Sequence, residues 1–168
     1  MNSKKTKIKD IANIEMYLKR IAYQIYENNH EEDNSLIIVG IDKNGKILAN
    51  KIFEILKSIS SFDLKLMSIQ INKKNPTNKI LSSIDENICL NKNIIIVDDV
   101  LNTGKTLIYA VRFFLKIPVK KIQTAVIINR NHKKFPIKAD FKGISLSTSI
   151  KEHVNVILEG SKKGIYLS

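Results

Sequence analysis

Two adjacent aspartates, Asp98 and Asp99, follow an apolar run and precede the Thr-Gly-Lys-Thr segment at 103–106. Neighbouring carboxylates repel each other, so the pair is costly unless a cation or a group of hydroxyls faces it. At the start of a helix, residues 103–106 would offer free backbone N–H groups, two hydroxyls and the positive end of the helix dipole, which together bind phosphate. Carboxylates for sugar hydroxyls or magnesium, followed by a phosphate site, match a ribose 5-phosphate.

Two other interpretations of this segment are weaker. Residues 104–106 share Gly-Lys-Thr with the P-loop of nucleoside triphosphatases, but that motif requires a glycine at the position of Asp99. Alternatively, Asp98 and Asp99 merely cap and solubilise a turn between a strand and a helix. A cap needs one carboxylate, however, and does not need the phosphate-binding segment that follows.

The segment belongs to the second of two predicted strand-loop-helix units. Continuous β-branched runs predict buried strands, and apolar residues spaced three and four apart predict helices. The first unit has a strand over 36–41, a tight loop over 42–45 and a helix over 47–59, and the second has a strand over 94–97, a polar loop over 98–104 and a helix over 107–115.

The rest of the chain completes an α/β pattern. Because strands alternate with helices, we predict an open, mainly parallel, twisted sheet flanked by helices, with a small β-rich region at the C-terminus. Such sheets bind ligands at the carboxyl ends of their strands. The remaining predicted elements are a helix over 8–26, a polar loop over 27–34, strands over 64–71 and 122–128, an excursion or weak hairpin over 72–92, a polar loop over 129–138, and short strands near 145–149, 154–158 and 165–167.

The charge balance is strongly basic. The chain has 28 basic and 16 acidic residues and a formal net charge of +12, which attracts polyanions such as phosphates and nucleic acid. Codon bias is a competing explanation, because only Arg20, Arg112 and Arg130 are arginines and the chain is rich in lysine, isoleucine and asparagine. The lysines are scattered, and no arginine-rich or aromatic-basic segment predicts a single-strand-binding surface.

Length and cysteine content exclude several classes of protein. With 168 residues and 43% apolar content, we expect a single domain over 1–168 that buries roughly 70% of its unfolded surface. No apolar run approaches the ~18 residues of a membrane span, and residues 1–10 are polar, so we expect a cytoplasmic protein without a membrane partner. A single cysteine, Cys89, excludes a disulfide scaffold or a thiolate metal cluster and is expected to be a small apolar filler.

The segment over 98–106 resembles the phosphoribosyl pyrophosphate (PRPP) motif of type I phosphoribosyltransferases. The resemblance extends over most of the chain to the bacterial pyrimidine operon attenuator proteins that double as uracil phosphoribosyltransferases. Residues 39–49 look like the pyrophosphate loop of that family. Residues 125–132 and 136–141 resemble its base-binding loop, and 147–149 is similar to the stretch that follows. The resemblance implies a phosphoribosyltransferase-type sheet with a small C-terminal β-rich hood.

The resemblance also implies roles for the matched residues. Asp98 and Asp99 would face the ribose 2′ and 3′ hydroxyls, directly or through Mg²⁺. Arg130 and His132 would lie beside the base, although His132 is equally well explained as a solvated loop residue. The pyrophosphate would be approached by backbone N–H groups of Lys43, Asn44 and Gly45, and the 5-phosphate would be held by the loop of Val100, Leu101, Asn102, Thr103, Gly104, Lys105 and Thr106.

The chain departs from the family at the pyrophosphate end. The family's loop usually contains a Thr-Arg-Gly step, whereas this chain has Lys-Asn-Gly at 43–45 preceded by Asp42, whose charge opposes an anion. The excursion over 72–92 is shorter than usual, and Lys73 and Lys74 are the only candidates to replace its arginine. A lysine offers a point charge but not the bidentate geometry of arginine.

These features predict a Mg²⁺-dependent phosphoribosyltransferase with slow turnover. It would transfer ribose 5-phosphate from PRPP to a pyrimidine base, with uracil or UMP as the expected partner, and release pyrophosphate. A purine is disfavoured because purine enzymes have an aspartate base where this chain has Asn102. One alternative is an RNA-binding, pyrimidine-responsive regulator that keeps the nucleotide pocket with weak or no catalysis, and another is a structural protein. We expect a homo-oligomer, with a dimer as the simplest form.

Overall fold

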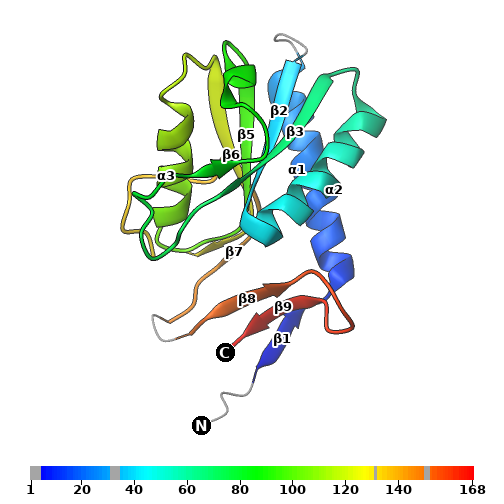
Figure 1. Ribbon diagram of the computed structural model, residues 1–168. Helices are drawn as coiled ribbons and strands as arrows, with labels where there is room; N and C mark the ends of the chain where they lie inside the picture. Colours follow the sequence, from blue (N-terminus) through cyan, green and yellow to red (C-terminus); the bar gives the residue numbers. More distant parts are fainter. Residues whose placement is uncertain (1–4, 31–34, 131, 150–151) are drawn as a thin grey trace.

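A six-stranded sheet forms the centre of the protein (Figure 1). The computed structural model describes residues 5–30, 35–130, 132–149 and 152–168. The strand order is β4-β3-β2-β5-β6-β7, in which all neighbours are parallel except β4 and β3. The strands are β2 (Ser35–Ile41), β3 (Asp63–Gln70), β4 (Leu81–Ser82), β5 (Asn93–Leu101), β6 (Lys121–Arg130) and β7 (Phe141–Leu146).

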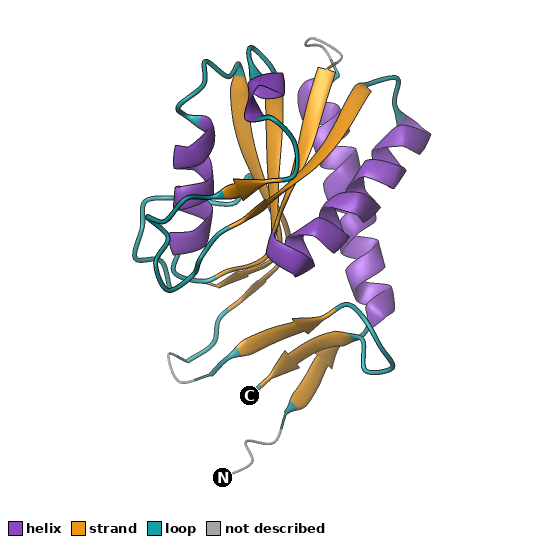
Figure 2. Cartoon of the chain, in the orientation of Figure 1, coloured by secondary structure: helices purple, strands orange, loops and turns teal. Residues whose placement is uncertain are grey.

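Helices cover both faces of this sheet (Figure 2). Helices α1 (Ile11–Asn29) and α2 (Asp42–Ile59) pack in the core of one face, and α3 (Lys105–Phe114) packs in the core of the other. The α3 side also includes residues of the connection between β3 and β5, which contains the 3₁₀ helix η1 (Glu86–Cys89). The predicted open, mainly parallel α/β sheet is therefore confirmed. None of the helices in the described ranges has the length and hydrophobicity to span a membrane.

A separate three-stranded antiparallel sheet forms the hood. Its order is β1-β9-β8, with β1 (Thr6–Lys9), β8 (Val154–Ile157) and β9 (Gly164–Leu167). The hood therefore includes a strand from the N-terminal end of the chain, which we had predicted as helix from residue 8. The spacing of Ile8 and Ile11 continues the helical stripe, but Asp10 accepts a hydrogen bond from Asn13 N–H and caps α1 between them.

Several predicted boundaries near the carboxyl edge of the sheet were wrong. Strand β5 continues through Asp98 to Leu101, and β6 continues to Arg130, although we had predicted loops from 98 and 129. The two strands remain paired as far as Leu101 and Asn129, because backbone pairing continues after the apolar side chains end. Likewise, the loop predicted over 42–45 is the first turn of α2.

Two other predictions changed in smaller ways, and the prediction for Cys89 is confirmed. Helix α1 extends into the loop predicted over 27–34. Residues 31–34 of that loop, and residue 131 of the loop predicted over 129–138, lie outside the described residues. The strand near 145–149 corresponds to the end of β7. Cys89 is buried as an apolar filler beside Met67, and burial raises the pKa of its thiol to about 11.

Gly45 allows the first turn of α2 to lie directly against β5. A Cβ atom at residue 45 would stand 2.6 Å from the carbonyl oxygen of Val97. Any other residue must therefore push the helix start away from β5, the strand that carries Asp98 and Asp99.

We expect Gly45→Ala to lower the free energy of unfolding by about 1–3 kcal/mol, because the added methyl group meets backbone atoms that cannot rotate away. Thermal unfolding should show a midpoint lower by ~2–4 °C for each kcal/mol lost. Asn50→Ala, on the exposed face of the same helix, is the control and should change stability by no more than about 0.5 kcal/mol. Equal midpoints for Gly45→Ala and wild type would contradict this close packing.

Candidate active site at the carboxyl edge of the sheet

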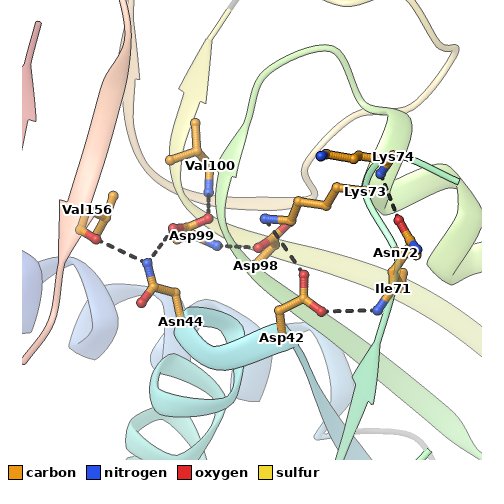
Figure 3. A network of polar contacts seen from close by, with 10 residues as sticks. All are labelled: Asp42, Asn44, Ile71, Asn72, Lys73, Lys74, Asp98, Asp99, Val100 and Val156. Carbon is orange, nitrogen blue, oxygen red and sulfur yellow. Dashed lines mark hydrogen bonds and ion pairs between the residues drawn. The ribbon is translucent and has the colours of Figure 1, made fainter. Parts of the chain in front are cut away.

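The predicted site residues gather at the carboxyl edge of the parallel strands, and Figure 3 shows those around the aspartate pair. Strand β5 carries the aspartate pair near its end, α2 begins directly after its neighbour β2, and residues 71–74 follow β3. On the other side of β5, the end of β6 adds Arg130. Because parallel strands share one carboxyl edge, side chains from four distant parts of the sequence lie together.

The predicted 5-phosphate loop encloses a small cavity between β5 and α3. The cavity has a volume of about 60 Å³ and is lined by Asp98, by residues 100–107 and by Val126. The N-cap of α3 is Gly104, which has no side chain to bind the N–H groups of the first turn, and Lys105 N–H donates instead to Oγ1 of Thr103 at 3.3 Å. Those N–H groups and the hydroxyls of Thr103 and Thr106 are the phosphate-binding groups that the sequence predicts.

The conformation of this loop depends on Gly104. Its φ of 85° is in the left-handed region, and a Cβ atom would stand 2.6 Å from Cγ2 of Ile137. The carbonyl oxygen of Thr103 accepts hydrogen bonds from the N–H groups of Lys134 and Phe135 at 2.9 and 3.1 Å. The phosphate loop is therefore connected directly to the segment that follows β6.

Asp98 is a buried carboxylate on the α3 side of β5. It is 6% exposed, and its Oδ1 accepts a hydrogen bond of 2.9 Å from Asp99 N–H. Burial, and then the charge of Asp99, raise the pKa of Asp98 well above its usual range, while the charge of Lys73 acts in the opposite direction. Asp98 is therefore a carboxylate whose charged form needs a further cation or hydroxyl donors.

Asp99 points to the α2 side, because successive residues of a strand face opposite ways. Its Oδ2 accepts a hydrogen bond of 2.7 Å from Nδ2 of Asn44, and its Oδ1 accepts one of 2.8 Å from Val100 N–H. The same Asn44 nitrogen donates to the carbonyl oxygen of Val156 in the hood at 3.1 Å (Figure 3). Asn44 therefore joins the second aspartate to the hood, which sequence patterns did not indicate.

The predicted pyrophosphate loop is a helix N-terminus. Its backbone N–H groups belong to the first turn of α2, where no intrahelical carbonyl precedes them, so they remain available to an anion. The side chains of this turn are engaged elsewhere, since Asn44 binds Asp99 and the Nζ of Lys43 lies 2.5 Å from Glu159 Oε2. Gly45 is buried against β5 and, having no side chain, can contact a ligand only through its backbone.

The two predicted catalytic-loop lysines differ in position. The Nζ of Lys73 lies 3.7 Å from Oδ2 of Asp42, at the edge of the site (Figure 3). Lys74 is exposed, as Lys73 is, but it contacts Oδ1 of Asn72 through its backbone N–H, which donates the hydrogen bond. Of the two, the structure places Lys73 beside the acidic residues.

Arg130 and His132 organise the opposite end of the site. Arg130 is 3% exposed, and it donates from Nε to Thr148 Oγ1 at 2.9 Å and from Nη2 to Glu152 O at 2.8 Å. The Nε2 of His132 lies 2.8 Å from the carbonyl oxygen of Thr148, so this ring is bound to the protein. Both side chains line a cavity of about 410 Å³ with Asn102, Thr103, Lys133, Lys134 and His153. Sequence patterns had not indicated His153.

The donor set at the aspartate pair fits magnesium in one particular mode. Among the described residues, no group of three or more His, Cys, Asp and Glu side chains could hold a metal ion. Mg²⁺ is commonly bound by one or two carboxylates together with water and substrate phosphates. Asp98 and Asp99 therefore fit an ion that binds together with a phosphorylated substrate.

Comparison with known proteins identifies the family. Residues 4–159 match the model of the phosphoribosyl transferase domain. The chain belongs to the phosphoribosyltransferase family. It is 37% identical over 161 residues to the Bifunctional protein PyrR of Staphylococcus aureus, covering 90% of this chain and 91% of that protein. It is 35% identical over 158 residues to the protein of the same name from Fusobacterium nucleatum, covering 89% of each. These relatives confirm the resemblance inferred from the segments at 39–49 and 98–106.

Solved phosphoribosyltransferase structures share the fold. The hypoxanthine phosphoribosyltransferase of Trypanosoma cruzi superimposes with a TM-score of 0.74 at 15% identity, covering 84% of this chain and 81% of that one. At this identity the likeness concerns the fold of the phosphoribosyltransferase and not its choice of base.

The raised pKa of Asp98 predicts how stability depends on pH. The folded protein holds this proton more tightly than the unfolded chain, so the unliganded protein loses stability as pH rises from about 4 towards the raised pKa. We expect Asp98→Asn to be more stable than wild type at neutral pH, with a midpoint higher by ~2–4 °C for each kcal/mol gained. The gain should shrink as the pH approaches 4.

Thermal unfolding of both proteins between pH 4 and 8 measures this difference. Asp63→Asn, an exposed aspartate at the start of β3, is the matched control and should follow wild type throughout. A lower midpoint for Asp98→Asn at neutral pH would show that the ionised carboxylate stabilises the unliganded fold.

Proposed function

We propose that this phosphoribosyltransferase transfers ribose 5-phosphate from PRPP to uracil and releases pyrophosphate. The main support is the juxtaposition of the buried Asp98 with the free N-terminus of α3 around one cavity. A carboxylate for sugar hydroxyls and N–H groups for a phosphate are thereby available to the same ribose phosphate.

The chain's own residues would hold the sugar rather than attack it. The first turn of α3 and the hydroxyls of Thr103 and Thr106 would bind the 5-phosphate. Asp98 and Asp99 would bind the ribose hydroxyls and Mg²⁺, which supplies positive charge to the pyrophosphate when bound. With the sugar held on both sides, the bond between C1 and the pyrophosphate oxygen can break. Its electron pair leaves with the pyrophosphate, and positive charge develops on the ribose ring. No protein nucleophile is required.

The base would occupy the cavity between the phosphate loop and the hood. This cavity is lined by Asn102, Arg130, His132 and His153, among others. Asn102 offers an amide but no proton-accepting carboxylate, which favours a pyrimidine over a purine. Since Arg130 is held by Thr148 and Glu152, its role would be to shape this cavity, and His132 is better placed to meet the base.

The leaving group would meet an unusual charge distribution. Pyrophosphate concentrates negative charge, and the nearby first turn of α2 has Asn44 and Asp42 in place of an arginine fork. Lys73 and Lys43 are cations at this end of the site, and both are paired with carboxylates in the unliganded protein. The loss of one transition-state contact typically lowers kcat by about 10²–10³, so we propose slow turnover.

A radiolabelled assay of uracil, orotate, hypoxanthine, guanine and adenine with PRPP tests the proposed reaction. We expect Mg²⁺-dependent formation of UMP, at a rate that Asn44→Arg increases if the first turn keeps its backbone path. The double variant Asp98→Asn, Asp99→Asn should weaken PRPP binding by several kcal/mol, since charged hydrogen bonds contribute ~1.5–3 kcal/mol each. Turnover of a purine in preference to uracil, or unchanged PRPP affinity in the double variant, would overturn this assignment.

An RNA-binding regulatory role is the second candidate function, because the relatives reported above are named bifunctional proteins and this chain has a net charge of +12. If only the scattered lysines bind RNA, each phosphate contact contributes about −0.7 to −0.9 to the slope of log affinity against log salt. We therefore expect RNA binding that is largely lost at raised salt. A sequence-selective complex that survives at high salt, in a titration against a scrambled RNA of equal length, would favour the regulator over the enzyme.

A further inference from the structure

Asp42 connects three parts of the pyrophosphate end of the site. It is the first residue of α2, and its φ of 53° is in the left-handed region. Its Oδ1 accepts a hydrogen bond of 3.0 Å from Ile71 N–H, and its Oδ2 lies 3.7 Å from Nζ of Lys73 (Figure 3). One carboxylate therefore fixes both the end of β3 and the side chain of the lysine that follows it.

The charges around Lys73 make this contact important for a ligand. The ammonium group of Lys73 lies 3.7 Å from Oδ2 of Asp42, and its charge also acts to lower the pKa of the buried Asp98. A cavity of about 460 Å³ opens beside this pair, and its lining residues include Lys43 and Lys79. Asp42 is the one carboxylate among those lining residues, so it is the group that repels an anion entering there.

We propose that Asp42, which lines this cavity, is a positioning residue that pairs with Lys73 beside it, and that the pyrophosphate group of PRPP replaces Asp42 as the partner of Lys73 when it binds. This inference rests on the proposed function, because it assumes that PRPP is the ligand. A nucleoside monophosphate has no pyrophosphate and leaves the Asp42–Lys73 pair closed. The pair therefore lowers the affinity for PRPP and leaves the affinity for a nucleoside monophosphate unchanged.

The geometry allows the charge of Asp42 to be removed without removing its structural contacts. Asn tolerates a positive φ, and its side-chain oxygen can still accept the hydrogen bond from Ile71 N–H. Asp42→Asn therefore separates the electrostatic role from the anchoring of β3. If this variant fails to fold, Asp42→Gly also removes the charge and adopts a positive φ freely.

Calorimetric titrations of Mg²⁺-PRPP and of UMP into wild type, Asp42→Asn, Lys73→Gln and the double variant test the proposal. We expect Asp42→Asn to bind PRPP at least about fivefold more tightly and Lys73→Gln at least about fivefold more weakly, corresponding to ~1 kcal/mol for unit charges about 4 Å apart in water. The double variant should lie close to wild type. UMP affinity should stay within about twofold in all four proteins. Lys65→Gln, on the exposed part of β3, is the charge-matched control and should change neither affinity.

The possible outcomes separate the inference from the proposed function. Equal changes for PRPP and UMP would assign Asp42 a purely structural role and overturn the inference alone. Wild-type affinity for PRPP in either single variant would likewise overturn the inference and leave the proposed function standing. A wild-type protein that binds neither ligand would overturn the proposed function and this inference with it.

Discussion

The cost of burying the Asp98 carboxylate is the constraint on which the rest of the site depends. It lies near the end of β5, directly after the apolar run 94–97 and directly before a second carboxylate. Without a ligand, the charged form is disfavoured by burial and by Asp99, and Lys73 offsets only part of this effect. A ligand that brings hydroxyls and a divalent cation would relieve the same electrostatic cost, which is the basis for proposing a sugar phosphate with Mg²⁺.

The first turn of α2 distributes polar contacts around this centre. Gly45 lets the turn approach β5, and its neighbours then contact three different parts of the molecule. Asn44 joins Asp99 to the hood, Lys43 pairs with Glu159, and Asp42 binds the segment after β3. A change at this turn therefore affects the hood, the aspartate pair and the lysine loop together.

The base side is organised by a buried cation. Arg130 donates hydrogen bonds to Thr148, Ser149 and Glu152. These bonds hold the residues before β8 against the end of β6. His132 binds the same segment through the carbonyl oxygen of Thr148. In addition, Thr103 accepts hydrogen bonds from the segment that follows His132. The phosphate loop and the base cavity thus share one connected framework.

The sequence alone determined the parallel α/β sheet and the family, and it predicted the phosphate loop, because β-branched runs, helical spacing and the segment at 98–106 are local patterns. It also showed that an arginine fork is missing beside Asp42. Only the tertiary structure decided that the first strand joins the hood, that residues 42–45 begin a helix, and how Asn44 and Lys73 are paired. The contacts of Asn44 and Lys73 join residues that are 29 or more positions apart in the chain, and the other features depend on which strand faces which helix. Side-chain periodicity within one segment predicts neither the distant contacts nor the packing of strand against helix.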